Sequence, residues 1–267
     1  MNFVCPKCRG ALTLERGVAR CSLGHAYDRA KAGYFNFLLN SSGGTHGDNR
    51  EMVEARRAFL DTGAYFPLAK KVSELARLYI SGTRALDIGC GEGYYTDVIG
   101  REISNVGAKV SAFDISKDAV KYAARRNKSL ELAVASAYKM PTADKSFDLA
   151  VNMFSPLAQD EVYRTLKPGG IFILAVPGEE HLFGLKQAAY KNPYKNRLAD
   201  THLDGFELIR TERISYNLDL NSQADIQALF MMTPYAYRTP ADDKKRVLSL
   251  QCLRTEADFV IFVYKRV

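Results

Sequence analysis

Short apolar runs alternate with helical apolar repeats from residue 84 onward. Runs that end at polar or glycine-rich positions predict buried strands, whereas apolar residues spaced three and four apart predict helices. Alternation of the two is typical of an α/β domain with a mostly parallel, doubly wound sheet. The pattern predicts strands over 84–88, 109–113 and 130–135, with helices over 94–102 and 116–126 between them.

The rest of the pattern adds four strands, so that a sheet of seven strands is expected. Two of these strands continue the parallel order, and the last two predict an antiparallel pair. The added strands end at Val151 or cover 171–176, 206–218 and 257–266. The added helices, with apolar residues on one face, cover 51–60, 67–80, 159–166 and a segment within 224–238.

Composition changes at two points before this predicted sheet. Residues 41–50 are small, polar and glycine-rich, which is typical of a flexible linker. We therefore expect a small module over 1–40, the linker, and a large domain over 51–267. No apolar run is long enough to span a membrane, and the N-terminus lacks a signal-peptide pattern. A cytoplasmic protein without membrane association is expected.

The first predicted strand runs into a glycine-rich turn, Asp87-Ile-Gly89-Cys-Gly91-Glu92-Gly93. Glycines at alternate positions let a ligand approach the backbone closely. The dinucleotide fingerprint has its third glycine one position later, and the Glu92 carboxylate at a helix start would repel a pyrophosphate. A cationic nucleoside without phosphate fits better. S-adenosylmethionine is such a ligand, and the turn resembles motif I of the Rossmann-like methyltransferases.

Asp114, at the end of the second predicted strand, independently indicates a nucleoside. An acid about 20 residues beyond the glycine turn hydrogen-bonds the ribose hydroxyls in this fold. Its alternative role is to cap the helix that begins near Ser116. After the third predicted strand, Ser136 and Ala137 stand where many methyltransferases place an Asp for the adenine amino group. We therefore assign that contact to Ser136 or to a backbone carbonyl.

The segment Asn152–Pro156 follows the fourth predicted strand. Ligands of open α/β sheets bind beyond the carboxyl ends of strands, so this segment should face the transferable methyl group. Its aromatic residue offers a stacking face for a planar base. His181 is expected at the same end of the sheet, where it either contacts the cofactor or merely opens a helix.

Cys5-x-x-Cys8 and Cys21-x-x-x-His25 form the strongest chemical motif of the first forty residues. Each pair can present two ligands, and together they can close a tetrahedron around zinc. Four protein ligands leave no open position, which indicates a structural ion whose binding supplies most of the folding energy of the module. Free thiols or a redox pair are the alternative.

Positive charge is concentrated near the N-terminus. The formal net charge is +7, which permits a polyanionic partner without requiring one. Four cationic residues lie among the predicted zinc ligands, where they either contact phosphates or form a solvated surface. These residues are Lys7, Arg9, Arg16 and Arg20.

In combination, these motifs resemble the RlmA-type 23S rRNA guanine-N1 methyltransferases over essentially the whole chain. Beyond the cysteine pairs and the glycine turn, the matching runs are Lys31-Ala-Gly-Tyr-x-Asn36-x-Leu38, Gly47-Asp48, Met52, Ala55–Leu60 and Val176-Pro177-Gly178-x-x-His181-Leu182. The resemblance implies that Cys5, Cys8, Cys21 and His25 hold zinc, and that Tyr65, Gly91, Glu92 and His181 contact S-adenosylmethionine.

The resemblance also implies a substrate and an assembly. The expected substrate is a guanine in a hairpin of domain II of 23S rRNA, and the expected assembly is a homodimer whose cleft holds the RNA. Relatives that methylate neighbouring guanines differ in ribosomal sensitivity to macrolides such as tylosin. Which guanine this chain takes stays open.

Methyl transfer to guanine N1 needs a proton acceptor, because N1 carries a proton in the neutral base. No carboxylate stands out as the base; Asn152 and Ser155 are candidates to position the ring, and Asp160 is a candidate acceptor. The target must also be unpaired or flipped out. Two rival hypotheses are a small-molecule methyltransferase of the same fold and a non-enzymatic RNA-binding protein.

Overall fold

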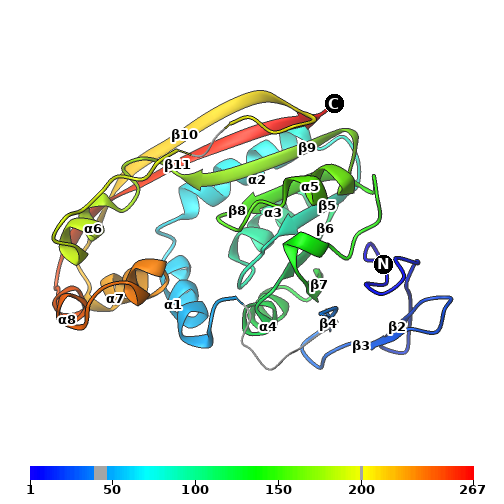
Figure 1. Cartoon of the computed structure of the whole chain (residues 1–267), viewed down its shortest axis with the longest axis horizontal. Helices are drawn as coiled ribbons and strands as arrows, with labels where there is room; N and C mark the ends of the chain where they lie inside the picture. Colours follow the sequence, from blue (N-terminus) through cyan, green and yellow to red (C-terminus); the bar gives the residue numbers. More distant parts are fainter. Residues whose placement is uncertain (39–46, 199–200) are drawn as a thin grey trace.

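The computed structural model describes residues 1–38, 47–198 and 201–267 (Figure 1). Most of the predicted linker over 41–50 therefore lies outside the described residues. The strands of the main sheet are β4 (Tyr34–Asn36), β5 (Arg84–Ile88), β6 (Lys109–Asp114), β7 (Glu131–Val134), β8 (Phe147–Met153), β9 (Leu166–Pro177), β10 (Phe206–Leu220) and β11 (Leu253–Arg266).

The main sheet has eight strands in the order β10-β11-β9-β8-β5-β6-β7-β4. From β9 to β4 neighbouring strands pair in parallel, whereas β11 pairs antiparallel with both β9 and β10. The predicted α/β class, with a mostly parallel sheet and a final antiparallel pair, is confirmed. The eighth strand, β4, comes from the first forty residues and extends the seven expected strands by one.

Helices cover both faces of the sheet, and most begin and end within a few residues of their predicted bounds (Figure 1). None of the helices in the described residues combines the length and apolarity that a membrane span requires. The helices are α1 (Arg50–Asp61), α2 (Phe66–Tyr79), α3 (Tyr94–Ser104), α4 (Lys117–Arg126), α5 (Gln159–Thr165), α6 (Phe183–Ala189), α7 (Gln223–Met231) and α8 (Ala241–Leu248).

Helix α8 has no counterpart among the predicted elements. Its sequence, ADDKKRVL, is mostly charged, and Val247 is its buried residue. A helix with so few apolar positions gives no periodic signal, so it forms here because α6 and α7 pack against it.

The N-terminal module folds around a small antiparallel sheet of β1 (Thr13–Glu15), β2 (Val18–Arg20) and β3 (Ala26–Asp28). It is joined to the large domain by backbone contacts. The amide of Val4 donates to the carbonyl of Pro141 at 2.9 Å, and β4 pairs with β7 at the edge of the main sheet. Figure 1 shows this module beside β7 and remote from α6 and α8.

The core divides into two apolar clusters, one on each face of the sheet. Alternation along β9 shows the division: Ile171 and Ile173 belong to one cluster, and Phe172 and Leu174 to the other. The second cluster also contains Phe3 and other apolar residues of the N-terminal module. The module is therefore packed onto one face of the sheet.

Candidate functional site

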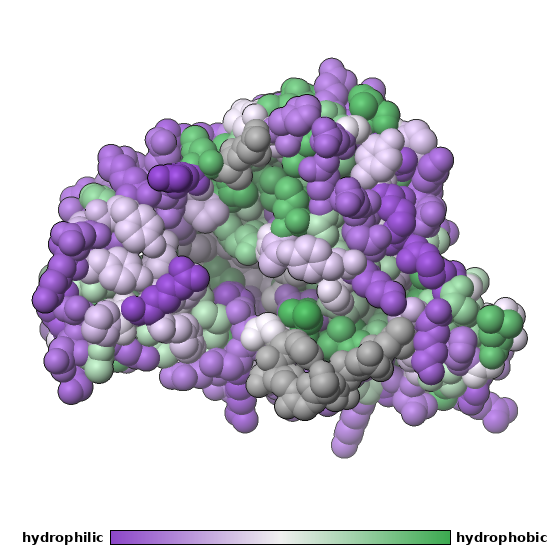
Figure 2. Space-filling model, viewed as in Figure 1, coloured by the Kyte–Doolittle hydropathy of each residue, from purple (hydrophilic) through white to green (hydrophobic). Residues whose placement is uncertain are grey.

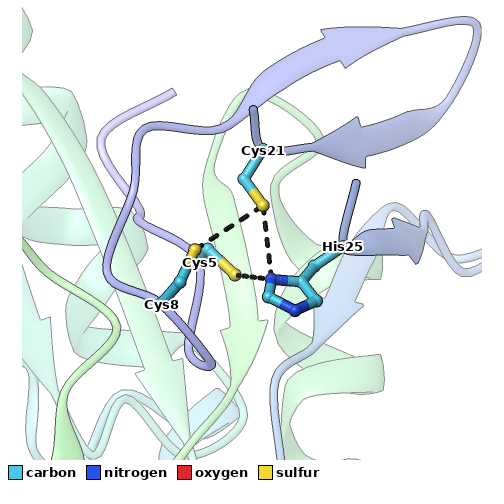
Figure 3. A group of neighbouring side chains, drawn as sticks. All are labelled: Cys5, Cys8, Cys21 and His25. Atoms are coloured by element: carbon cyan, nitrogen blue, oxygen red, sulfur yellow. Dashed lines mark hydrogen bonds between the residues drawn. The ribbon is translucent and has the colours of Figure 1, made fainter. Parts of the chain in front are cut away.

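The four predicted zinc ligands converge in the N-terminal module (Figure 3). Cys5 and Cys8 precede β1, whereas Cys21 and His25 flank the turn between β2 and β3. Their ligand atoms all lie within 4.8 Å of one another. The Nδ1 atom of His25 is 3.4 Å from the sulfurs of Cys5 and Cys21, and the sulfurs of Cys8 and Cys21 are 3.6 Å apart.

These spacings match the edges of a zinc tetrahedron. With Zn–S near 2.3 Å and Zn–N near 2.0 Å, the edges are roughly 3.5–3.8 Å. Burial raises the pKa of the Cys5 thiol, but hydrogen bonds from the Tyr27 hydroxyl and from backbone amides outweigh burial and lower it to about 6. Cys5 therefore supplies a thiolate at neutral pH, as zinc requires.

A cavity of about 440 Å³ opens at the carboxyl ends of β5, β6, β7 and β8, beside α1. Figure 2 shows the surface hollowed between the lobe that carries α7 and α8 and this end of the sheet. Of the predicted cofactor residues, those lining the cavity are Gly89, Gly91, Glu92, Asp114, Ser136 and Ala137. The structure therefore brings these six residues together around one pocket, and their contact with a cofactor stays a prediction.

The glycine turn needs glycine for two different reasons. Gly89 and Gly91 both have positive φ values, +74° and +54°. A Cβ on Gly89 would lie 2.3 Å from the Cβ of Ser155, so the packing of the protein excludes it. A Cβ on Gly91 would meet only the Arg56 guanidinium, at 3.9 Å, which leaves its Cα open toward the cavity.

Asp87 is buried beneath the turn and does not line the cavity. Its Oδ2 atom accepts from the Thr96 hydroxyl at 2.5 Å, while its buried Oδ1 atom has no hydrogen-bond partner among the described residues. Burial, together with the nearby Asp114 carboxylate, raises the pKa of Asp87 to about 7. An orphaned carboxylate oxygen next to the turn fits a site for a cationic ligand.

The carboxylate of Asp114 bridges two backbone amides. It accepts from the amide of Gly91 at 2.9 Å and from that of Ser116 at 2.7 Å. The alternative role as helix cap belongs to Ser116, whose hydroxyl accepts from the amide of Ala119. Asp114 therefore lines the pocket, and its hydrogen bond to the ribose hydroxyls stays a prediction.

Glu92 is held by Arg126, whose Nε and Nη2 atoms donate to its Oε2 atom at 3.0 and 2.7 Å. Burial raises the pKa of this carboxyl, and the Arg126 charge offsets the effect only in part. Glu92 and Asp114 line this end of the pocket and Asp87 lies buried beneath it, so the surroundings are acidic, which suits a sulfonium and an ammonium group better than phosphate.

Tyr65 and His181 lie together behind the pocket wall. The Tyr65 hydroxyl is 3.4 Å from Nε2 of His181, and both rings pack on Phe259. Phe259 in turn contacts Phe154, which lines the cavity. Burial lowers the pKa of His181 to about 3, so its imidazole is neutral. Their predicted contact with the cofactor stays a prediction.

The candidate catalytic residues have structural partners. Asn152 is buried; its Oδ1 accepts from the amide of Ser155 at 3.2 Å and its Nδ2 donates to the carbonyl of Pro156 at 3.3 Å. The Ser155 hydroxyl donates to the carbonyl of Ile88 at 2.8 Å. Asp160 is exposed on α5 and does not line the cavity. Asn152 and Ser155 thus shape the loop.

Several further residues line the cavity, which the sequence indicates only through the family resemblance or as a stacking face. Asp48 and Arg56 form an ion pair at the mouth, and Met52 lies on the same face of α1 as Arg56. Phe154 holds a left-handed backbone, φ +61°, rare for a bulky residue. These residues belong to α1 and to the loop after β8, two segments that are far apart in the sequence and meet only in the folded chain.

Comparison with known proteins agrees with this geometry. A family model described as "RlmA, N-terminal" matches residues 3–39, and one described as "Methyltransferase domain" matches residues 86–174. Together with the Cys₃His cluster, these matches show that the chain uses S-adenosylmethionine and holds a structural zinc ion. Among solved structures, the MccD protein has a TM-score of 0.48 at 18% identity, over 75% of this chain and 98% of that chain.

Two curated relatives match nearly the whole chain. The 23S rRNA (guanine(748)-N(1))-methyltransferase of Streptomyces fradiae is 32% identical over 251 residues, covering 91% of this chain and 88% of the relative. YxjB of Bacillus subtilis (strain 168), named as a 23S rRNA (guanine-N(1)-)-methyltransferase, is 32% identical over 252 residues, covering 90% and 88%. The chain belongs to the RlmA-type family of S-adenosylmethionine-dependent 23S rRNA (guanine-N1)-methyltransferases.

Proposed function

We propose that this chain methylates N1 of one guanine in a hairpin of domain II of 23S rRNA. The observation that carries the proposal is the joining of the cysteine module to the sheet that forms the cofactor pocket, through β4 and the Val4 amide. The two relatives that are 32% identical to this chain over 88% of their own length are named for 23S rRNA guanine-N1 methylation.

The aromatic side of the pocket suits a flipped base. Phe154 is 40% exposed, lines the cavity, and is buttressed by Tyr95 and Phe259. Base stacking on such a ring contributes about 1–3 kcal/mol. The left-handed backbone of Phe154, held by the hydrogen bonds of Asn152 and Ser155, orients the ring before the substrate arrives.

Bound S-adenosylmethionine supplies a methyl group on a positively charged sulfur. The neutral thioether would be the leaving group, and the part of this chain is to accept the N1 proton as the methyl group is transferred. Among the cavity carboxylates, Glu92 is held by Arg126 and Asp114 by two amides. Asp48 also pairs with an arginine, Arg56, but it lies at the mouth with its side chain 34% exposed, and we assign it the acceptor role.

The proposed reaction can be tested with a transcribed domain II hairpin and labelled cofactor. Nucleoside mass spectrometry should find 1-methylguanosine at one position, and replacement of that guanine by adenine should abolish the product. A product at another atom, or methylation of small acceptors alone, would overturn the proposal.

Asp48→Asn should lower kcat by about 10²–10⁴-fold with unchanged cofactor affinity, and Asp160→Asn should leave kcat near the native value.

A homodimer and an influence on macrolide sensitivity complete the proposal. Both rest on the resemblance to the RlmA-type family. Light scattering with the native chain should give twice the chain mass of 29.8 kDa. A deletion strain complemented by this chain should change its inhibitory concentration of tylosin, and a monomer or an unchanged concentration would remove the respective part of the proposal.

A further inference from the structure

One side of α4 is lined with positive charge. Lys117, Lys121 and Arg125 are exposed and follow one another at four-residue intervals, and exposed Lys128 follows the helix. Each interval advances about 6 Å along the axis and keeps the side chains on one side. The opposite side buries alanines and a valine against the sheet. The cations therefore form a continuous row facing away from the core.

Two hollows flank α4 and extend this row. The hollow toward the N-terminal module has a volume of about 520 Å³ and takes its cations from Arg29, Lys31 and Lys128. None of the described residues that line it is acidic. The hollow toward α1 has a volume of about 170 Å³ and is lined by Arg50, Lys121 and Arg125, with Asp118 as its one acidic lining residue.

Tyr122 holds two neighbouring cations in place. The guanidinium carbons of Arg57 and Arg125 lie 5.3 and 5.9 Å from the centre of its ring. Its hydroxyl donates to Glu54 at 2.7 Å, and Glu54 also pairs with Arg50. Ring contacts of this kind orient a guanidinium without neutralising it. Arg57 also pairs with Asp61, so the guanidinium that Tyr122 holds in position for a partner is that of Arg125.

The charged row begins at the cofactor pocket. Asp114 and Ile115, directly before α4, line the cavity, and the Ser116 hydroxyl donates to the carbonyl of Asp48 at the mouth. From there the row leads along α4 to the turn at Arg29–Gly33 of the N-terminal module. A long anion bound on this face can therefore reach the pocket and the zinc module together.

We propose that Arg29, Lys31, Lys121, Arg125 and Lys128 bind the sugar–phosphate backbone of the RNA next to the target base. The inference rests on the proposed function. A chain of phosphates matches cations at roughly 6 Å steps, and side-chain amines and guanidinium groups are its usual partners. A lipid surface fits less well, because none of the large apolar residues that the structure exposes lies on α4 or in the Arg29–Gly33 turn.

The test compares two triple variants with equal change of charge. Lys121→Gln/Arg125→Gln/Lys128→Gln alters the proposed face, and Lys70→Gln/Arg77→Gln/Arg101→Gln removes exposed cations from α2 and α3. Affinity for the domain II hairpin is measured by fluorescence anisotropy across a salt series, and cofactor affinity by calorimetry. Vesicles with a high content of anionic lipid serve as the second probe.

The first variant should bind the hairpin roughly tenfold to a hundredfold more weakly, with the salt slope reduced by about 2. Its cofactor affinity should equal that of the native chain, and the second variant should bind RNA within about twofold of native. Equal RNA affinity in native and first variant, equal loss in both variants, or vesicle binding without RNA binding would overturn the inference. If the proposed function is wrong, the native chain itself will methylate another atom of the RNA. This outcome distinguishes failure of the proposed function from failure of the inference about the charged face.

Discussion

Gly89 shows how a single position connects the glycine turn to the loop that follows β8. Its missing Cβ leaves room for Ser155, whose hydroxyl donates to the carbonyl of Ile88. Ser155 in turn donates its amide to Asn152, and Phe154 between them holds the left-handed backbone that orients its ring. The cofactor turn and the aromatic wall are therefore one packed unit.

Gly89→Ala should lower the free energy of unfolding by about 2–5 kcal/mol. The left-handed backbone accounts for about 1–2 kcal/mol of this and the clash with Ser155 for about 1–3 kcal/mol. Gly169→Ala is the matched control, because Gly169 also has positive φ but a Cβ there would meet no atom within 4 Å. Its expected loss is about 1–2 kcal/mol in urea denaturation.

A double variant isolates the clash. In Gly89→Ala/Ser155→Gly the two side-chain atoms that the new Cβ would meet at 2.3 and 2.5 Å are gone, and the Cα at position 155 lies 3.8 Å away. A double-mutant cycle should therefore give a favourable coupling of about 1–3 kcal/mol. Additive losses would show that the two positions do not interact as the structure indicates.

Asp87 predicts a pH dependence of stability in the cofactor-free protein. The pKa of Asp87 is about 7 in the folded chain, against an ordinary value of 3.8, so between these two pH values the folded state holds a proton that the unfolded state has lost. Stability should fall as pH rises from about 4 to about 7 and then level off. Asp87→Asn removes this component. The free energy of unfolding of the variant, relative to that of the native chain, should therefore increase by a few kcal/mol across the window.

Urea denaturation at pH 5 and pH 8 checks this sign. Asp242→Asn is the control, because Asp242 is almost fully exposed. The difference between native and Asp87→Asn isolates Asp87 from Glu92 and Asp114, whose pKa values burial also raises. A constant difference at the two pH values would contradict the assignment of the raised pKa to Asp87.

At the scale of elements, the segment over residues 140–144 is the part of the large domain that the zinc module contacts. Arg164 of α5 holds it by donating to the carbonyl of Thr142 at 2.8 Å and to Asp144 at 2.7 Å. The same guanidinium pairs with Glu161, and it is largely buried. One side chain therefore fixes the segment that receives the amide of Val4.

Arg164→Gln should lower the free energy of unfolding by about 2–3 kcal/mol, because several buried acceptors lose a charged donor. Arg9 of the zinc module makes similar bonds to Thr142 and Asp144 from the exposed side. Arg9→Gln should therefore cost less than about 1 kcal/mol. Chemical denaturation of both variants checks the contrast, and equal losses would mean that burial of Arg164 does not matter.

At the scale of the whole molecule, the zinc module and the large domain should unfold together. β4 belongs to the module segment and pairs with β7, and Phe3 and Cys5 share an apolar cluster with Phe172. Zinc binding to the folded module therefore stabilises the entire chain by mass action.

Cys8→Ser should lower the zinc content well below one ion per chain and shift the main calorimetric transition to lower temperature. Cys252→Ser is the control, since Cys252 is exposed and far from the cluster in sequence. Elemental analysis and calorimetry provide the two measurements. A separate small transition that disappears while the main one stays unchanged would contradict coupled unfolding.

Much of this molecule could be predicted without its tertiary structure. The strand over 84–88 agrees with β5, and the Cys₃His cluster and the lining by Gly91 and Asp114 follow from local spacing. Helix α8 was missed because it is mostly charged. Polarity alone makes Asn152 and Ser155 candidates for positioning the substrate ring. Their hydrogen-bond partners lie in their own loop and in β5.

The sequence by itself determined most elements of the large domain, the glycine turn and the zinc ligands, because each depends on residues close together along the chain. Only the tertiary structure decided the rest. It paired β4 with β7, placed Tyr65 and His181 behind the pocket wall, and brought Arg29 beside Lys128. These contacts join distant segments, and their geometry follows from packing, which no local pattern encodes.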